Sequence, residues 1–157
     1  MPDNNGAVFF EVFNEIGIIE QLSRTLLEMR LPDGLIAPHF AVVNHLTRLG
    51  DGRALIDIAR AFQVPKTSMT HTIKGLQAHG MVEVRPNPDD GRSKLVFLSH
   101  KGRAMRGQVI ADLGPDFERL ASGIDVERLQ GILPMLKDLR MFLDEDRNGV
   151  SSRPSSG

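Results

Sequence analysis

Residues 81–99 read MVEVRPNPDDGRSKLVFLS, with two short apolar segments on either side of a loop that holds prolines, aspartates and a glycine. Short segments rich in Val, Leu and Phe that flank such a loop are typical of a β-hairpin. Elsewhere, apolar residues recur at the three- and four-residue spacing of helices. The sequence therefore predicts a mainly α-helical chain with a small β-hairpin, and any fold must place that hairpin among the helices.

The loop of this hairpin concentrates charge in Asp89, Asp90, Arg92 and Lys94. Three interpretations compete: an ordinary solvated tip, a metal or phosphate site built on the paired aspartates, and a charged finger directed at another molecule. The metal interpretation is weak, because no further carboxylate or histidine is placed for it nearby in the sequence. The five histidines also lack the i, i+4 spacing that suits one helix face, so we expect neither a metal nor a cofactor.

Helical periodicity extends over six further segments, and the breaks between them coincide with Pro, Gly and Asp residues. The expected helices span about residues 8–29, 37–49, 54–62, 65–79, 102–120 and 125–143. From Arg147 onward the sequence is rich in Ser, Gly and Pro, which predicts a flexible tail over residues 147–157.

The helices expected at 54–62 and 65–79 are short and are joined by a tight turn at Gln63–Val64, which is a helix-turn-helix arrangement. In such a pair the second helix can enter the major groove of DNA. Its polar face carries short hydroxyls that suit base edges and phosphates, and lysines that neutralise phosphates. A solvated helix face is the alternative. The candidate DNA contacts on this helix are Lys66, Thr67, Ser68, Thr70, His71 and Lys74.

The charge distribution favours the DNA interpretation. The whole chain has a net charge of −1, but residues 65–103 hold seven Lys or Arg against three Asp or Glu. A basic centre between acidic flanks indicates one surface that meets a polyanion.

A hairpin directly after a helix-turn-helix makes a winged helix-turn-helix. Arg92 at its tip suits a narrow minor groove, and Arg85 and Lys94 add two further candidate DNA contacts. Asp90 can brace the wing, by pairing with Arg92 or with the backbone of the turn. On the second strand Leu95 and Phe97 share one face, so that face of the wing needs a cover.

These motifs resemble the MarR family of bacterial winged-helix regulators. The resemblance is carried by the segment LQAHGMV at 76–82, the wing PNPDDGR at 86–92, and the strand VFLS at 96–99 followed by Gly102. The wing signature of the family, an Asp and an Arg one residue apart, matches Asp90 and Arg92. Its strand-to-helix signature matches Leu98, Ser99 and Gly102.

Some positions depart from the family pattern. Gly91 stands where a basic residue is usual, and the third helix offers Arg53–Ala54 in place of a Ser or Thr cap. Gly114–Pro115 and Pro134 interrupt helices that are long in the family. Since a proline inside a helix kinks or breaks it, we expect altered helix geometry there.

The resemblance implies a homodimer whose N- and C-terminal helices interlock, so that two recognition helices read a palindrome with half-sites roughly 34 Å apart. The expected organisation is an N-terminal dimerisation helix at 1–36, a winged helix-turn-helix domain at 37–100, C-terminal dimerisation helices at 101–146 and the tail. Many members bind a small aromatic ligand. Candidate lining residues are Phe9, Phe13, His39 and Val43.

The sequence thus predicts a DNA-binding transcriptional regulator, a ligand-responsive repressor, with double-stranded DNA and a second copy of itself as partners. The alternative is a winged-helix module that binds protein. No nucleophile–base pair or phosphate loop indicates an enzyme. The chain has no cysteine, no signal-like segment and no apolar run long enough for a membrane, so we expect a cytoplasmic protein.

Overall fold

The computed structural model describes residues 4–151. The chain divides into two compact units, residues 1–114 and 115–157. Helices dominate both units, and three strands form one small antiparallel sheet in the first. The predicted fold class, mainly helical with a hairpin wing, is therefore confirmed. Within the described residues, none of the helices combines the length and apolar character that crossing a bilayer requires.

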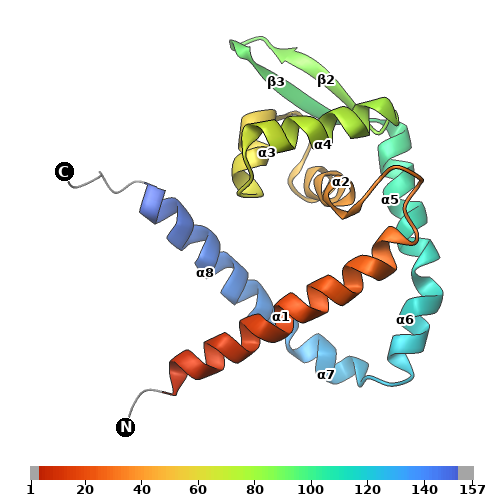
Figure 1. Ribbon diagram of the computed structural model, residues 1–157, viewed down its shortest axis with the longest axis vertical. Coiled ribbons are helices and arrows are strands. Elements are labelled where there is room, and N and C mark those ends of the chain that lie inside the picture. The colour runs from red at the N-terminus through yellow and green to blue at the C-terminus, as the bar shows by residue number, and fades with distance from the viewer. Residues whose placement is uncertain (1–3, 152–157) are drawn as a thin grey trace. The chain divides into compact units, whose positions relative to one another are not determined.

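The first unit contains five helices and the sheet among its described residues (Figure 1). Its helices are α1 (Asn5–Glu28), α2 (Ala37–Leu49), α3 (Leu55–Ala61), α4 (Lys66–Ala78) and α5 (His100–Asp112). Its strands are β1 (Arg53–Ala54), β2 (Val82–Asn87) and β3 (Asp90–Leu98). Helices α1 to α4 lie within a few residues of the positions that their periodicity predicts.

One hydrophobic core holds α2 to α5 and the sheet together. The apolar stripe of α4, Met69, Ile73 and Leu76, points into it and is buried, as helical spacing requires. Fully burying such side chains stabilises the fold by about 1.5–3 kcal/mol each. The largest fully buried side chains are Val42, Val43, Leu46, Ile58, Ile73, Leu76, Val96 and Val109.

Arg53 and Ala54, expected at the start of the third helix, instead form strand β1. They pair antiparallel with Val96 and Leu95, so the strand order in the sheet is β1-β3-β2. Helix α3 therefore begins at Leu55 without a side-chain cap. The two residues are extended because they find backbone partners in β3, which lies more than forty positions away in the sequence.

The junction between β3 and α5 explains the Leu-Ser-x-x-Gly motif. The Ser99 hydroxyl accepts a hydrogen bond from the Gly102 N–H at 3.0 Å and donates one to the Gly80 carbonyl at 2.5 Å. A Cβ on Gly102 would lie 2.2 Å from the Met81 carbonyl oxygen, so the backbones approach too closely for any side chain there. This junction fixes the hairpin to the start of α5.

The second unit consists of α6 (Gly114–Ala121), α7 (Val126–Gly131) and α8 (Leu133–Ser151). Continuous helices were expected at 102–120 and 125–143, and each is divided in two. Pro115 and Pro134 are the second residues of α6 and α8, where a proline is tolerated because its missing N–H has no helical partner. Asp125 caps α7, since its carboxylate accepts from the Arg128 N–H at 3.1 Å.

The boundary expected for the flexible tail also differs from the structure. Helix α8 continues through residues 147–151, whereas residues 152–157 of the expected tail lie outside the described residues.

Candidate nucleic-acid interface

A tight turn presents the N-terminal end of α4. Gln63 has a positive φ of 53°, and the Val64 N–H donates to the Ala59 carbonyl at 3.1 Å, which closes the end of α3. Pro65 then precedes the first residue of α4. The core stripe of α4 fixes its rotation, so its opposite face must point to solvent. On that face Lys66, Thr67, Ser68, His71 and Lys74 are exposed.

Thr70 differs from its neighbours, because it is half-buried and its hydroxyl donates to the Lys66 carbonyl at 2.8 Å. A threonine that bonds back to its own helix has used its hydrogen as a donor, although its oxygen can still accept. Among the candidate DNA contacts on α4, Ser68 and His71 thus have freer side-chain donors than Thr70.

Two short side-chain-to-backbone bonds close the wing. The Asp90 carboxylate accepts from the Arg92 backbone N–H at 3.0 Å, and the Asn87 side-chain oxygen accepts from the Asp89 N–H at 3.0 Å. Both are turns of the kind that Asp and Asn favour. Asp90 thus holds the backbone of the turn, which was one of its two expected roles. The second brace is Asn87, which the sequence did not single out; an Asn two residues before Asp89 is the sequence signal for it.

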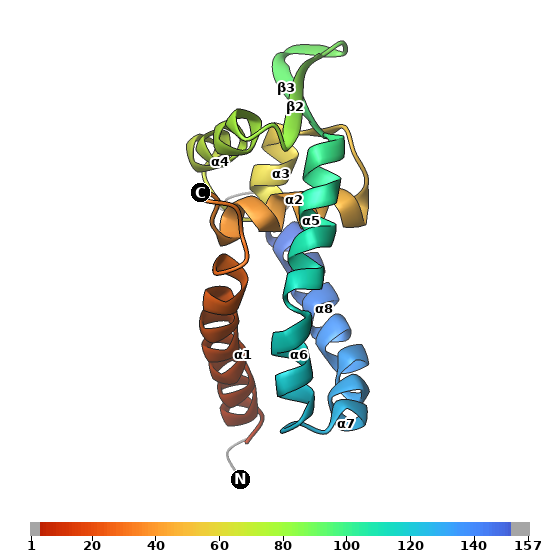
Figure 2. The same ribbon diagram turned by 90° about the vertical axis from the view of Figure 1, so that its right-hand side faces the viewer.

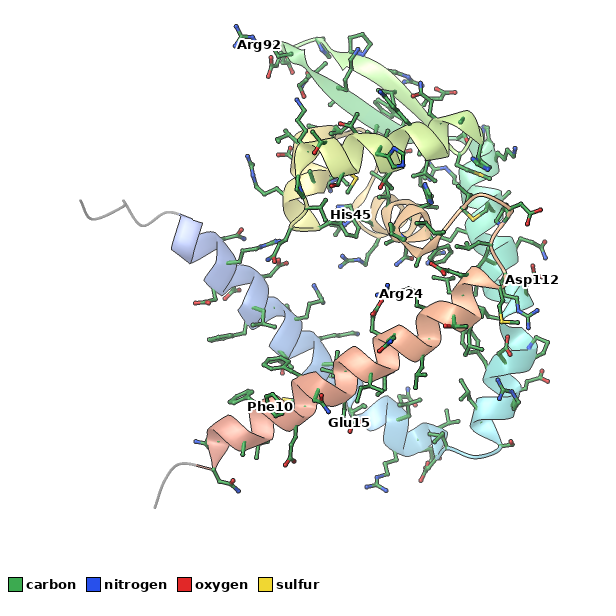
Figure 3. The ribbon with its side chains drawn as sticks, viewed as in Figure 1. Phe10, Glu15, Arg24, His45, Arg92 and Asp112 are labelled. Carbon is green, nitrogen blue, oxygen red and sulfur yellow. The ribbon has the colours of Figure 1, made fainter. Side chains whose placement is uncertain are left out.

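Arg92 lies at the far end of the hairpin (Figure 3) and is exposed. Lys94, also exposed, lies two residues along β3, opposite Pro86. In two perpendicular views the hairpin lies next to α4, and its tip extends beyond the helices of the first unit (Figures 1 and 2). The candidate DNA contacts of helix and wing therefore sit on adjacent elements of one unit.

Arg85 supplies the cover that Phe97 needs. Its guanidinium carbon lies 4.3 Å above the centroid of the Phe97 ring, and its Nη2 pairs with the Glu83 carboxylate at 2.9 Å. Leu95 is half-buried in the middle strand, between Ala54 and Arg85. The side chain of Arg85 is therefore engaged within the wing, although the sequence made it a candidate DNA contact.

Two histidines form hydrogen bonds with the backbone at the ends of α2 and α4. The Nδ1 atom of His39 accepts from the Ile36 N–H at 2.9 Å and caps α2, and the ring nitrogens of His79 lie 2.9 Å from the Gly75 and Asp33 carbonyls. Partial burial lowers the pKa of His39, and the nearby His79 and His71 act in the same direction.

His45 packs on the Phe62 ring at a centroid distance of 5.2 Å. Partial burial lowers its pKa, and the charges of Arg48 and Arg53 add to that effect. Both His39 and His45 are thus held in environments that favour the neutral ring.

The four residues expected to bind an aromatic ligand lie in different environments in the described structure. Val43 is fully buried in the core, and His39 caps a helix with its Nε2 against Gly75. Phe9 and Phe13 stack on each other at 6.3 Å on the exposed surface of α1. The ligand-binding role of these four residues stays a prediction, and Val43 itself is fully buried in the core.

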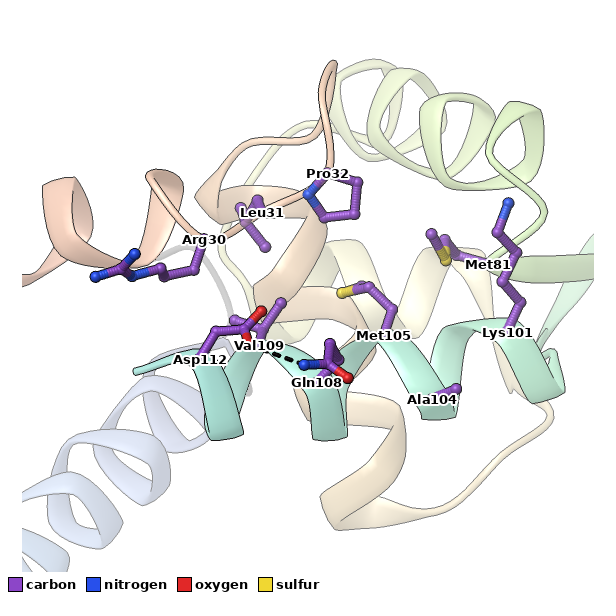
Figure 4. Close-up of a pocket in the computed structure, with 10 residues that line it drawn as sticks. All are labelled: Arg30, Leu31, Pro32, Met81, Lys101, Ala104, Met105, Gln108, Val109 and Asp112. Carbon is purple, nitrogen blue, oxygen red and sulfur yellow. Dashed lines mark hydrogen bonds between the residues drawn. The ribbon is translucent and has the colours of Figure 1, made fainter. Parts of the chain in front are cut away.

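An open pocket of about 460 Å³ lies instead between the segment after α1 and one face of α5 (Figure 4). The sequence did not indicate it, because three separate segments form its walls. They contribute Arg30, Leu31, Pro32, Met81, Lys101, Ala104, Met105, Gln108, Val109 and Asp112. Within the described part of the chain, no three His, Asp or Glu side chains lie close enough to hold a metal ion.

Comparisons with known proteins agree with this geometry. A family model described as the MarR family matches residues 33–93. The wild-type apo MarR of E. coli is 25% identical, with a TM-score of 0.67 over 80% of this chain and 94% of that chain. A mutant E. coli MarR in complex with operator DNA is 23% identical, with a TM-score of 0.67 over 88% and 99%.

A third similar structure is that of Bordetella bronchiseptica BpsR, whose DNA binding is regulated by 6-hydroxynicotinic acid. It is 22% identical, with a TM-score of 0.66 over 83% of this chain and 98% of that chain. The family model covers the helix pair and the wing up to residue 93, and the structural likeness extends through most of the chain. Residues 33–93, which hold the winged helix, therefore match the MarR family model, and the fold of the chain is that of MarR structures.

Proposed function

We propose that this protein is a sequence-specific DNA-binding transcriptional regulator that binds a palindromic operator as a homodimer. The observation that carries the proposal is the pairing of an exposed polar face on α4 with an exposed arginine at the tip of the adjacent wing. The helix supplies groups for base edges and phosphates, and the wing supplies a cation for the minor groove. The similar E. coli MarR that was solved with operator DNA supports this use of the fold.

Unpartnered apolar side chains support the homodimer. Helix α1 buries none of its residues within the chain and exposes Phe9, Phe10, Ile19 and Leu22 by more than half. The second unit likewise exposes Phe117 and Phe142 by more than half. Apolar areas of this extent mark interaction sites, and a second copy of the same chain would offer matching surfaces.

Ligand control and repression form the finer part of the proposal. The pocket beside α5 includes Met81, three residues after the end of α4, so an occupant there would touch the segment that joins the recognition helix to the wing. A ligand that prefers one dimer shape would shift the population away from the DNA-binding shape. The regulation of BpsR by a small aromatic acid supports this arrangement.

The test is selection of fragments from the genome of the source organism by the purified protein, followed by titration of the selected duplex at several salt concentrations. We expect an inverted-repeat sequence and an affinity that falls steeply with salt. A winged-helix module that binds protein would select no common sequence. That result, with affinity independent of salt, would contradict the proposal.

A further inference from the structure

Arg85 is a candidate DNA contact whose charged end is engaged by two side chains of its own wing. The guanidinium lies 4.3 Å over the Phe97 ring and 2.9 Å from the Glu83 carboxylate. A cation over an aromatic face and an ion pair at such a distance are each modestly favourable near solvent. To reach a phosphate, Arg85 would have to give up both contacts.

The register of the hairpin brings these three side chains to one face. Glu83 is opposite Phe97 and Arg85 is opposite Leu95, and residues two apart on a strand point to the same side. Arg85 therefore reaches diagonally across to Phe97, at a spacing that long side chains can span. The contact ties β2 to β3 where the hairpin leaves the helices.

Phe97 is also held from the loop that precedes β1. Gly52 has a φ of +72°, and a Cβ there would lie 3.0 Å from Cε1 of the Phe97 ring. The Gly52 N–H donates to the Val96 carbonyl at 3.1 Å. The ring is thus in contact with Arg85 and with the loop between α2 and β1, so it connects the wing to the helical body.

We propose that Arg85 is a positioning residue. Together with Glu83 and Phe97 it fixes the direction in which the wing leaves the body, and so places Arg92, without itself contacting DNA. The inference rests on the proposed function, because it concerns how the wing meets DNA.

The length of the hairpin makes this contact consequential. Strand β1 pairs with Leu95 and Val96, so the hairpin beyond them has two strands, and a two-stranded hairpin alone is only marginally stable. From Leu95 to Arg92 the strand rises roughly 10 Å. A tilt of about 20° at Leu95 would therefore displace Arg92 by on the order of 3 Å, which is the length of a hydrogen bond.

Salt-dependent titration separates positioning from direct contact. A lysine or arginine that binds a phosphate contributes about one unit to the slope of log affinity against log salt. We expect Arg85→Ala and Phe97→Leu to weaken operator binding by a similar factor, about fivefold, with the slope unchanged. Phe97→Leu carries no charge change, so its effect must arise through the wing. Lys94→Ala, also in the wing, is the control for a shallower slope.

Two further variants sharpen the test. In the double variant Arg85→Ala/Arg92→Ala we expect little loss beyond that of Arg92→Ala, because the misplaced residue is already absent. Arg85→Lys keeps the charge but lacks the planar group that stacks on a ring, so we expect it to remain weakened. Three results would each overturn the proposal. They are a salt slope shallower by about one unit in Arg85→Ala, wild-type affinity for the operator in Arg85→Lys, and wild-type affinity in Phe97→Leu.

Amide hydrogen exchange without DNA distinguishes this inference from the proposed function. We expect the β3 amides from Leu95 to Phe97 to exchange faster in Arg85→Ala than in the wild type, and unchanged rates would overturn the bracing role. If the wild type bound no duplex yet these rates rose, the proposed function would fail while Arg85 would still be the residue that holds the wing.

Discussion

The winged-helix region buries its apolar side chains within the chain, whereas the flanking helices leave theirs exposed. From α2 to α5 the chain buries its large aliphatic residues in one core. At most 2% of the surface of each of these residues is exposed: Leu46, Ile58, Ile73 and Leu76. Helix α1 buries none of its residues, and residues 115–149 contain no buried side chain. Both regions have helical periodicity in the sequence, so periodicity alone does not tell which apolar face finds its partner within the chain.

The difference indicates two kinds of stability. The winged-helix core is complete in one chain, so its stability should not depend on protein concentration. The flanks leave aromatic and aliphatic side chains in water, and their stability should depend on association. Substitutions in the two regions separate these two contributions to stability.

Leu76→Ala should lower the free energy of unfolding by about 2–5 kcal/mol, because it leaves a cavity at a fully buried site. The measurement is chemical denaturation at two protein concentrations. Leu22→Ala on α1 is the matched control, since Leu22 is 66% exposed in the single chain. The decrease in the free energy of unfolding caused by Leu22→Ala should become smaller on dilution, whereas the decrease caused by Leu76→Ala should stay the same. If each variant lost the same free energy of unfolding at both concentrations, the stability of the two regions would not differ in its dependence on association.

Phe10→Asp should weaken self-association by roughly 2 kcal/mol or more, because a side chain that is 73% exposed in one chain would lose a buried position in the dimer. Light scattering and sedimentation over a range of concentrations measure the effect. Glu15→Ala on the same helix is the control and should leave the dimer intact. A variant that dimerises like the wild type would place the interface away from Phe10.

Arg92→Ala should weaken operator binding at least about tenfold, or 1.4 kcal/mol, without a change in melting temperature. Its side chain lies at the tip of the wing, and the bond from Asp90 that holds the turn goes to its backbone. Fluorescence anisotropy and calorimetry measure the two quantities. Lys137→Ala, an exposed cation of the second unit, is the control. An unaltered affinity at physiological salt would remove the wing from the interface.

The smallest expected effect is a pH dependence of the winged-helix core. The pKa of His39 and that of His45 are lowered from 6.5 in the folded chain, so the unfolded chain binds more protons below that value. Their stabilising contribution is present above about pH 6.5 and is lost as the pH falls through the folded pKa values. Denaturation of wild type and of His39→Gln/His45→Gln at several pH values should show a flatter profile in the variant.

Much of the fold follows from the sequence where local signals agree with packing. The stripe of Met69, Ile73 and Leu76 has helical spacing, and the turn at Gln63–Val64 allows only a short connection. Asp90 and Arg92 could be placed in the wing because turn chemistry is local. The exposed contacts on α4 follow from the same stripe, since a helix that buries one face exposes the other.

Features that depend on distant pairing could not be predicted. Strand β1 exists because Arg53 and Ala54 meet β3, and two residues carry no strand signal of their own. The partners of Arg85 depend on the register of the hairpin, which the sequence left open. The buried position of Val43 and the pocket beside α5 likewise depend on how separate segments pack.

The order of the strands has a consequence for aggregation. Because β3 is central, β2 forms an outer edge of the sheet along the projecting hairpin. An open edge can recruit a strand from another molecule. Here Pro86 has no N–H to offer along that edge, and Glu83 and Arg85 place charges beside it. These features disfavour pairing between this hairpin and the hairpin of a neighbouring molecule.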